Sequence, residues 1–295
     1  MEPIAIVREG ALCCDVLAHG GVRIAPDELG GLRQKPGPAP SVPLPAGLLK
    51  HSDDQTVAGV VAVLQAIASG GLGSTSFTEW GVLAAPRFLG RVAMVSLIQR
   101  FASEGAWGVT PHLIPHRSLH SLSGTVSQAL KIHGPNLGIG GGPGALPEIL
   151  WTATAMLHGD RLPGAWVVLT GWTPEPVGEA GEPLPDNSRC VGFAMALTAP
   201  RPGWRGARLR LTPISRVQSE EPATPSDGLS IESLQAALSV PDVRAATVVW
   251  QLDDGARLEV EHMDRTYGLA GPHSWPVGAG RVHVGSSGAG AENSL

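Results

Sequence analysis

Apolar residues along the chain follow two spacings, and these predict helices and strands in alternation. Apolar positions three and four residues apart, with capping or glycine signals at the ends, predict helices. Short continuous apolar runs predict buried strands. The predicted helices span residues 52–70, 88–101, 118–132, 145–158 and 230–238. The predicted strands span residues 4–7, 11–17, 80–84, 137–139, 166–170, 191–197 and 208–211.

Polar and glycine-rich stretches interrupt this pattern. Residues 23–49 are rich in proline and glycine and predict a long surface loop. Two runs at residues 245–252 and 257–261 flank Asp253-Asp254-Gly255 and predict a hairpin. The glycine and serine content of residues 278–295 predicts a flexible tail. Because helices alternate with buried strands, the chain as a whole is predicted to have a layered α/β fold.

The composition excludes several classes of function. The net charge of −5 gives no electrostatic reason to expect a nucleic-acid partner. No apolar stretch approaches the roughly 20 residues of a membrane span, and the N-terminal segment lacks the apolar core of a signal peptide. The 3 cysteines are too few for a disulfide framework, and Cys13-Cys14 lacks a second cysteine pair or a histidine cluster for zinc. We therefore expect a cytoplasmic protein with buried, reduced cysteines and neither metal nor cofactor.

A glycine-rich turn at residues 138–144 joins a predicted strand to a predicted helix. Such a turn presents one side chain at a helix N-terminus, where the helix dipole lowers the pKa of a thiol or holds an anion. No Cys, Ser, Thr or Lys occurs between residues 138 and 146, so the backbone suits a nucleophile but the nucleophile is missing. The turn could also cradle a phosphate, but no Lys-Ser/Thr pair follows it and no acidic residue is placed for a dinucleotide.

A group of histidines has two interpretations. His112, His116 and His120 recur every four residues, and on one helix they would share a face and could bind a metal. However, Pro111 and Pro115 disfavour a single helix across them. The alternative is that they are loop and helix-cap histidines.

An acidic and a basic cluster lie further along the chain. The acidic cluster occupies a proline-rich segment, which indicates a solvated loop. The basic cluster would suit a phosphopantetheine or an acidic carrier protein, and a solvated edge is the alternative. The acidic residues are Glu175, Glu179, Glu182 and Asp186, and the basic residues are Arg201, Arg205, Arg208 and Arg210.

The order of these segments resembles the N-terminal half of the β-ketoacyl synthases. Residues 121–130 with Gly134-Pro135-Asn136 resemble the family's helix and its Gly-Pro step into the nucleophile strand, and residues 158–172 resemble the apolar strand that follows. Residues 191–197 with Arg205-Gly206-Ala207 resemble the strand that closes that half. A closer resemblance is to the short ketosynthase-like proteins of aryl-polyene clusters, whose histidine-containing segment is similar to residues 116–121.

The resemblance covers residues 52–212 and implies a particular architecture. It predicts an α/β thiolase-like half, with a mixed sheet flanked by helices, and a small C-terminal α+β extension. The expected domains are a ketosynthase N-terminal-like domain at residues 1–214, an extension with a helix and a hairpin at residues 215–277, and the tail.

The catalytic groups of the family are missing from the matching positions. Counting from Gly134, the family's nucleophilic cysteine falls on Pro143, which has neither a thiol nor a backbone N–H. The two catalytic histidines of the family's second half have no counterpart after Pro213. Condensation needs the thiolate to hold the acyl chain and the histidines to polarise the extender thioester. The resemblance therefore implies that the family's reaction does not occur here.

The expected function follows from this combination of fold and missing groups. We expect a catalytically inactive accessory subunit, comparable to a chain-length factor, that acts with an active β-ketoacyl synthase in fatty-acid, polyene or polyketide-type biosynthesis. The expected partners are that synthase or a second copy of the chain, and an acyl carrier protein. Two alternatives stay open: a free-standing acyl or small-molecule binding module, and an acyltransferase or hydrolase that uses His116 and His120.

Half of a thiolase-like fold would leave one apolar face uncovered, which predicts association. A homodimer or a synthase partner would bury more than about 1,000 Å² over residues 118–132 and 137–139. In a third arrangement the chain's own segment at residues 229–261 folds back, and the hairpin at residues 245–261 covers that surface.

Overall fold

A computed structural model of the chain describes most of the residues before position 264. The described ranges are 10–37, 42–89, 91–109, 116–140, 142, 144–159, 162–175, 187–213, 228–239, 247–252 and 255–263. The chain divides into two units, Met1–Asp264 and Arg265–Leu295, and all of the described residues belong to the first. The predicted strand at residues 4–7 and the predicted tail lie outside the described residues.

The first unit contains eight strands and seven helices in its described residues. The strands are β1 (Leu12–Ile24), β2 (Gly81–Pro86), β3 (Asn136–Gly138), β4 (Ala165–Thr173), β5 (Arg189–Thr198), β6 (Ala207–Pro213), β7 (Thr247–Gln251) and β8 (Ala256–His262). The helices are α1 (Leu29–Gln34), α2 (Asp54–Ser69), α3 (Arg91–Glu104), the 3-10 helix η1 (Gly105–Gly108), α5 (His120–Leu130), α6 (Ala145–Gly159) and α7 (Ile231–Leu238).

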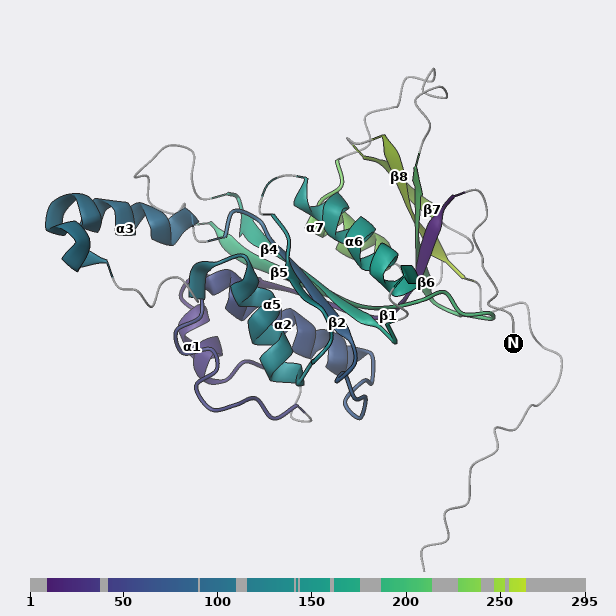
Figure 1. Cartoon of the computed structure of the whole chain (residues 1–295), viewed down its shortest axis with the longest axis horizontal. Coiled ribbons are helices and arrows are strands. Elements are labelled where there is room, and N and C mark those ends of the chain that lie inside the picture. Colours follow the sequence, from purple (N-terminus) through teal and green to yellow (C-terminus); the bar gives the residue numbers. More distant parts are fainter. Residues whose placement is uncertain are drawn as a thin grey trace, which may run out of the picture. The chain divides into compact units, whose positions relative to one another are not determined.

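All eight strands form one mixed sheet in the order β3-β2-β4-β5-β1-β6-β8-β7. The pairs of β2 with β3 and of β2 with β4 are parallel, and the other neighbours are antiparallel. Helices α2 and α5 lie on one face of the sheet, and α6 and α7 lie on the other (Figure 1). The predicted α/β fold with a mixed sheet flanked by helices is confirmed.

Each face of the sheet has its own hydrophobic core. One core joins α2 and α5 to the sheet around Val57, Leu122 and Trp166. The other joins α6 and α7 to the sheet around Ile149 and Leu234. Strand β4 supplies both cores, since successive side chains of a strand point to opposite faces and eight of its nine residues are buried.

The N-terminal part of the fold differs from the sequence prediction in three places. Strand β1 does not end at residue 17 but runs on through Gly20 and Gly21 to Ile24. Helix α1 lies within the segment predicted as a long loop. Helix α2 begins at Asp54, two residues after its predicted start, and is capped by Asp53, whose carboxylate accepts the backbone N–H of Gln55 at 2.9 Å.

The C-terminal segment contains the predicted helix and hairpin. Ser230 caps α7 with a reciprocal pair of bonds to Ser233, and β7 pairs with β8 as an antiparallel hairpin. The hairpin continues the main sheet through β6 at the opposite end from β3. The arrangement in which this hairpin covers residues 118–132 and 137–139 is therefore wrong. The predicted boundary at residue 214 lies outside the described residues and stays a prediction.

Candidate functional site

The carboxyl ends of the parallel strands β2 and β4 meet at one edge of the sheet, where α6 begins. Ligands bind at this edge in many open α/β sheets. A cavity of about 80 Å³ lies there. Its lining comes from the ends of β2 and β4, the start of β5, the first turn of α6 and the first turn of α7. The lining residues are Ala85, Arg87, Gly142, Ala145, Leu146, Leu169, Thr170, Gly171, Trp172, Thr173, Val191, Leu229, Ser230, Ile231 and Glu232.

Buried Gln55 at the start of α2 holds the strand ends together. Its Nε2 donates to the Arg87 carbonyl oxygen at 3.0 Å, and its Oε1 accepts the Thr170 hydroxyl at 3.0 Å. The Arg87 backbone N–H donates to the Thr170 carbonyl oxygen at 2.7 Å. The Thr170 hydroxyl is fully buried and already bonded, so it is a structural group and not a free nucleophile.

The first turn of α7 closes the cavity from the other side of the site. The Thr173 hydroxyl donates to Glu232 Oε1 at 2.9 Å and so ties the end of β4 to α7. The Ser230 hydroxyl accepts the Ser233 backbone N–H at 3.0 Å. Both hydroxyls in this part of the lining therefore serve to anchor α7.

The glycine-rich turn forms one wall of this cavity. The Ile139 backbone N–H donates to the Ala84 carbonyl oxygen at 2.8 Å, and α6 begins at Ala145, whose N–H donates to the Gly142 carbonyl oxygen at 3.1 Å. Pro143, the position counted as the nucleophile, lies outside the described residues, as does Gly141. The lining residues of the cavity that the structure describes include neither cysteine nor histidine.

All three cysteines are free and buried, and their environment disfavours the nucleophilic thiolate form. Burial raises the pKa of the Cys14 thiol to about 12, and it raises the thiol pKa values of Cys13 and Cys190 as well. Cys14 Sγ lies 3.7 Å from the Thr154 hydroxyl, which itself donates to the Leu150 carbonyl oxygen at 2.7 Å. The prediction of buried, unbridged cysteines is confirmed.

The candidate histidines do not line the cavity. The half-buried His116 ring lies 6.0 Å from the His51 ring, centroid to centroid. His120 is exposed at the start of α5, where its Nδ1 lies 3.3 Å from the Ser123 hydroxyl. His112 is outside the described residues. Where the structure describes side chains, no group of three or more His, Cys, Asp or Glu is placed to hold a metal ion.

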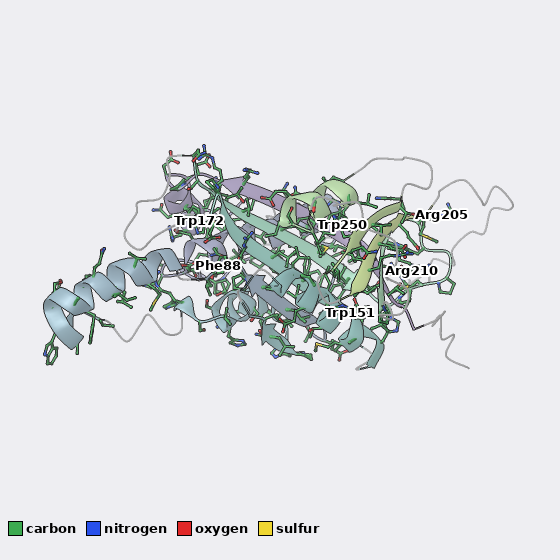
Figure 2. All side chains as sticks on the ribbon, turned by 90° about the horizontal axis from the view of Figure 1, so that it is seen from above. Phe88, Trp151, Trp172, Arg205, Arg210 and Trp250 are labelled. Carbon is green, nitrogen blue, oxygen red and sulfur yellow. The ribbon has the colours of Figure 1, made fainter. Side chains whose placement is uncertain are left out.

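The basic cluster is largely engaged within the fold. Arg208 Nε lies 2.8 Å from the fully buried Asp15 carboxylate, and Arg210 Nε lies 2.9 Å from Glu261. Arg201 stacks on Trp204 at 4.4 Å. Arg205 is exposed and, among the described residues, makes no ion pair (Figure 2). The arginines therefore mainly hold β1, β6 and β8 together. Of the acidic cluster, only Glu175 lies in the described part of the chain.

The sequence interpretation missed the residues that shape this cavity. Arg87, Thr170 and Glu232 come from three segments far apart in the sequence, and only Thr170 lies in a segment that resembles the ketosynthase family. The sequence offered only two weak signals for this cavity: a glutamine in the first turn of α2 and an acidic residue three positions after Leu229.

In the described residues no helix is long and apolar enough to span a membrane.

Neither a family model nor a curated protein sequence matches the chain. Two solved structures match it over nearly their full length. The ishigamide ketosynthase/chain length factor is 16% identical with a TM-score of 0.54, over 85% of this chain and 99% of that chain. The ketosynthase ApeO in complex with its chain length factor ApeC, from Xenorhabdus doucetiae, is 13% identical with a TM-score of 0.52, over 85% of this chain and 100% of that chain.

At these identities the matches establish the fold and leave the activity open. Strands β2 to β5 and the start of α6 lie within residues 52–212, the segment that resembles the ketosynthase N-terminal half, whereas β1, β7 and β8 of the same sheet lie outside it. The chain therefore has the thiolase-like fold of the ketosynthase and chain-length-factor structures.

Proposed function

We propose that this chain is a non-catalytic, ketosynthase-like accessory subunit that pairs with an active ketosynthase, in the role of a chain-length factor. The fold match carries the proposal, because it spans 99% and 100% of the matched chains in structures described as a ketosynthase with a chain length factor. Pairing of this kind contributes surface and shape to an assembly and does not require a nucleophile on both subunits.

The open end of the sheet supports pairing. Strand β3 ends the strand order and, among the described residues, pairs only with β2. An edge strand presents unpaired backbone donors and acceptors to a neighbouring chain. Leu137 on β3 and Leu119 before α5 are also 38% and 39% exposed. A partner that adds a strand to β3 would cover both leucines.

The chemistry of the cavity supports an accessory role over the two alternatives. Its described lining offers no thiol or imidazole, which disfavours acyl transfer or hydrolysis at this edge. At about 80 Å³ the cavity is well below the roughly 300–1,000 Å³ of typical ligand pockets, so the binding-module alternative finds little support at this edge.

Co-expression with the ketosynthase encoded nearest its gene tests this proposal, with light scattering to measure the mass of the complex. We expect a one-to-one heterodimer. Leu137→Lys should weaken it by at least about tenfold, because a charged lysine on an edge strand opposes strand addition. Val249→Lys is the matched control, since Val249 is 40% exposed on the opposite edge strand, β7. A monodisperse monomer that binds no ketosynthase would contradict the proposal.

A further inference from the structure

A larger cavity lies along strand β1, away from the edge where α6 begins. Its volume of about 410 Å³ falls within the roughly 300–1,000 Å³ of typical ligand pockets. Gln55 at the start of α2 bonds to the lining of the smaller cavity and Gln65 lines this one, so about 15 Å of helix separates the two. We call it the β1 cavity, and its polar side chains are those of His19, Gln65, Ser69, Gln235 and Ser239.

A break in the strand pairing of β1 creates the β1 cavity. Strand β6 pairs with β1 only over residues 12–15, whereas β5 pairs with β1 from Asp15 to Ile24. The register with β5 shifts between Val16 and Ala18, and bulges of this kind redirect a strand. Beyond this point, among the described residues, no strand lies beside β1 on the side opposite β5. Alternate residues of β1 therefore direct unpaired backbone groups to that side.

Two glutamine side chains line the β1 cavity from opposite faces of the sheet. Gln65 belongs to α2 and Gln235 to α7, and neither side-chain amide has a hydrogen-bond partner among the described residues. Gln55 differs, since both of its amide atoms are bonded within the fold. The Gln235 amide lies over Gly21, where an added Cβ would come within 2.5 Å of it. Each of the two cavity glutamines therefore offers free donors and a free acceptor to a ligand.

His19 supplies an acceptor nitrogen beside these amides. Its half-buried ring lies 6.1 Å from the Phe193 ring, centroid to centroid, and one ring nitrogen donates to the Leu238 backbone carbonyl. Burial lowers the pKa of the His19 imidazole below its ordinary value of 6.5, more than the Leu238 bond raises it, and nearby His262 lowers it further. The imidazole is therefore neutral at pH 7, and its second nitrogen accepts a hydrogen bond.

The charge around the β1 cavity disfavours ions. Its described lining includes no charged side chain. The C-terminal ends of α2 and α7 meet it at Gly70 and Ser239, and helix C-termini carry a partial negative charge. An anion would meet that charge without a cationic partner, and a cation would lose water without an acidic one. The Ser69 and Ser239 hydroxyls already donate to backbone carbonyl oxygens at 3.1 and 2.7 Å.

We propose that the β1 cavity binds a small uncharged ligand of the cyclic amide or urea type, in which an N–H donor adjoins a carbonyl acceptor. The ligand N–H donates to the free ring nitrogen of His19, and the Gln65 and Gln235 amides bond to its remaining polar edge. An apolar ligand would leave the imidazole and the amides without partners, which costs free energy. The ends of α2 and α7 bound the cavity on both faces and favour a compact ring over an extended chain. Strand β1 is distant from β3 in the sheet order, so this site does not depend on the proposed pairing.

Nuclear magnetic resonance of the histidine rings tests this site, with uracil as the probe. Uracil is an uncharged ring with adjoining N–H and carbonyl groups, 1,3-dimethyluracil lacks the N–H groups, and orotate adds a carboxylate to the uracil ring. Uracil should shift the ring signals of His19 and leave those of the exposed His120 unchanged. Both analogues should bind at least about tenfold more weakly, since one lacks donors and the other carries a charge.

Gln65→Leu measures what one glutamine contributes. Gln65 is exposed and belongs to neither hydrophobic core, so the variant should keep its unfolding midpoint. Loss of the amide should weaken uracil binding by roughly three- to tenfold. Gln99→Leu is the matched control, because it makes the same change at an exposed glutamine on α3 and should leave the affinity for uracil unchanged.

Four other results would overturn the proposal. Equal binding of uracil and 1,3-dimethyluracil would show that the hydrogen bonds to the ring do not form. Tighter binding of orotate would assign an anion site. A shift of the His19 signals by acetyl-trialanine amide and not by uracil would assign strand addition to β1. If uracil shifts no His19 signal at any soluble concentration, or binds Gln65→Leu as well as the wild type, the β1 cavity is not the site proposed.

Discussion

Glycine residues decide how closely helix α2 lies on the sheet. A Cβ added to Gly20 on β1 would lie 2.5 Å from the Ala66 backbone nitrogen, and one added to Gly192 on β5 would lie 2.5 Å from the Ala58 carbonyl oxygen. Side chains at these two positions would push α2 away from strands that share its core. Gly142 in the turn differs, since an added Cβ would meet no described atom within 4 Å.

Asp53 offers a test of burial against charge at the residue scale. Burial raises the pKa of the Asp53 carboxyl above its ordinary value of 3.8, despite the Arg117 guanidinium 3.7 Å away. Its carboxyl therefore favours folding when protonated. That contribution is complete below pH 3.8 and is lost as the pH rises through the folded-state pKa.

Asp53→Asn keeps the cap on α2 but removes the buried charge. We expect this variant to gain stability relative to the wild type as the pH rises from about 4 to about 7, as measured by urea unfolding. Asp53→Ala also loses the cap and should be about 1 kcal/mol less stable than Asp53→Asn at neutral pH. If Asp53→Asn instead loses stability relative to the wild type as the pH rises, the ion pair with Arg117 outweighs the burial of the charge.

At the scale of elements, the sequence predicts best where burial leaves a local pattern. Strands β4 and β5 are apolar on both faces, so their runs are continuous and lie close to the predicted ranges. Helix α2 has a capping signal at its start and glycine at its end. Strand β1 was predicted too short because the pair Gly20-Gly21 has the composition of a turn, although Gly20 lies against α2 and Gly21 lies against the Gln235 side chain of α7.

The cavity could not be predicted because no local pattern encodes it. Arg87, Thr170 and Glu232 meet only because the topology brings the ends of β2 and β4 and the start of α7 to one edge. The turn at residues 138–144 was predicted, since its glycines and the apolar helix that follows are contiguous.

Helix α7 tests whether the C-terminal extension is energetically separate. Leu234 is fully buried in the same core as α6 and the sheet. Leu234→Ala should therefore lower the free energy of unfolding by about 2–5 kcal/mol and shift a single transition as a whole. The exposed Ala236→Ser is the control and should change stability by no more than about 0.5 kcal/mol. A separate early transition, seen by circular dichroism and tryptophan fluorescence, would instead support an independent domain at residues 215–277.

At the scale of the whole molecule, the two ends of the sheet differ in what they expose. Leu137 is exposed on β3, and further large apolar side chains are exposed on α3 and η1, which follow β2 along the chain, whereas β7 ends the other side of the sheet with Val249 exposed. Large exposed apolar groups at one end favour association through that end. The cavity at the start of α6 gives no comparable reason to expect a reaction within this chain, because the hydroxyls of Thr170, Thr173 and Ser230 in its lining are bonded within the fold.

Pro143→Cys tests whether the missing nucleophile alone accounts for the predicted inactivity. The substitution places a thiol at the position counted as the family's nucleophile, next to the start of α6. Condensation also needs groups that polarise the extender thioester, and the described lining of the cavity contains no histidine. We expect the variant to accept at most an acyl group from an acyl-carrier thioester, visible by intact mass, and to form no condensation product with a malonyl thioester. The wild-type chain should acquire no acyl adduct, since its cysteines are buried with raised thiol pKa values. Robust condensation by Pro143→Cys alone would show that this chain holds the remaining catalytic groups and would contradict the accessory role.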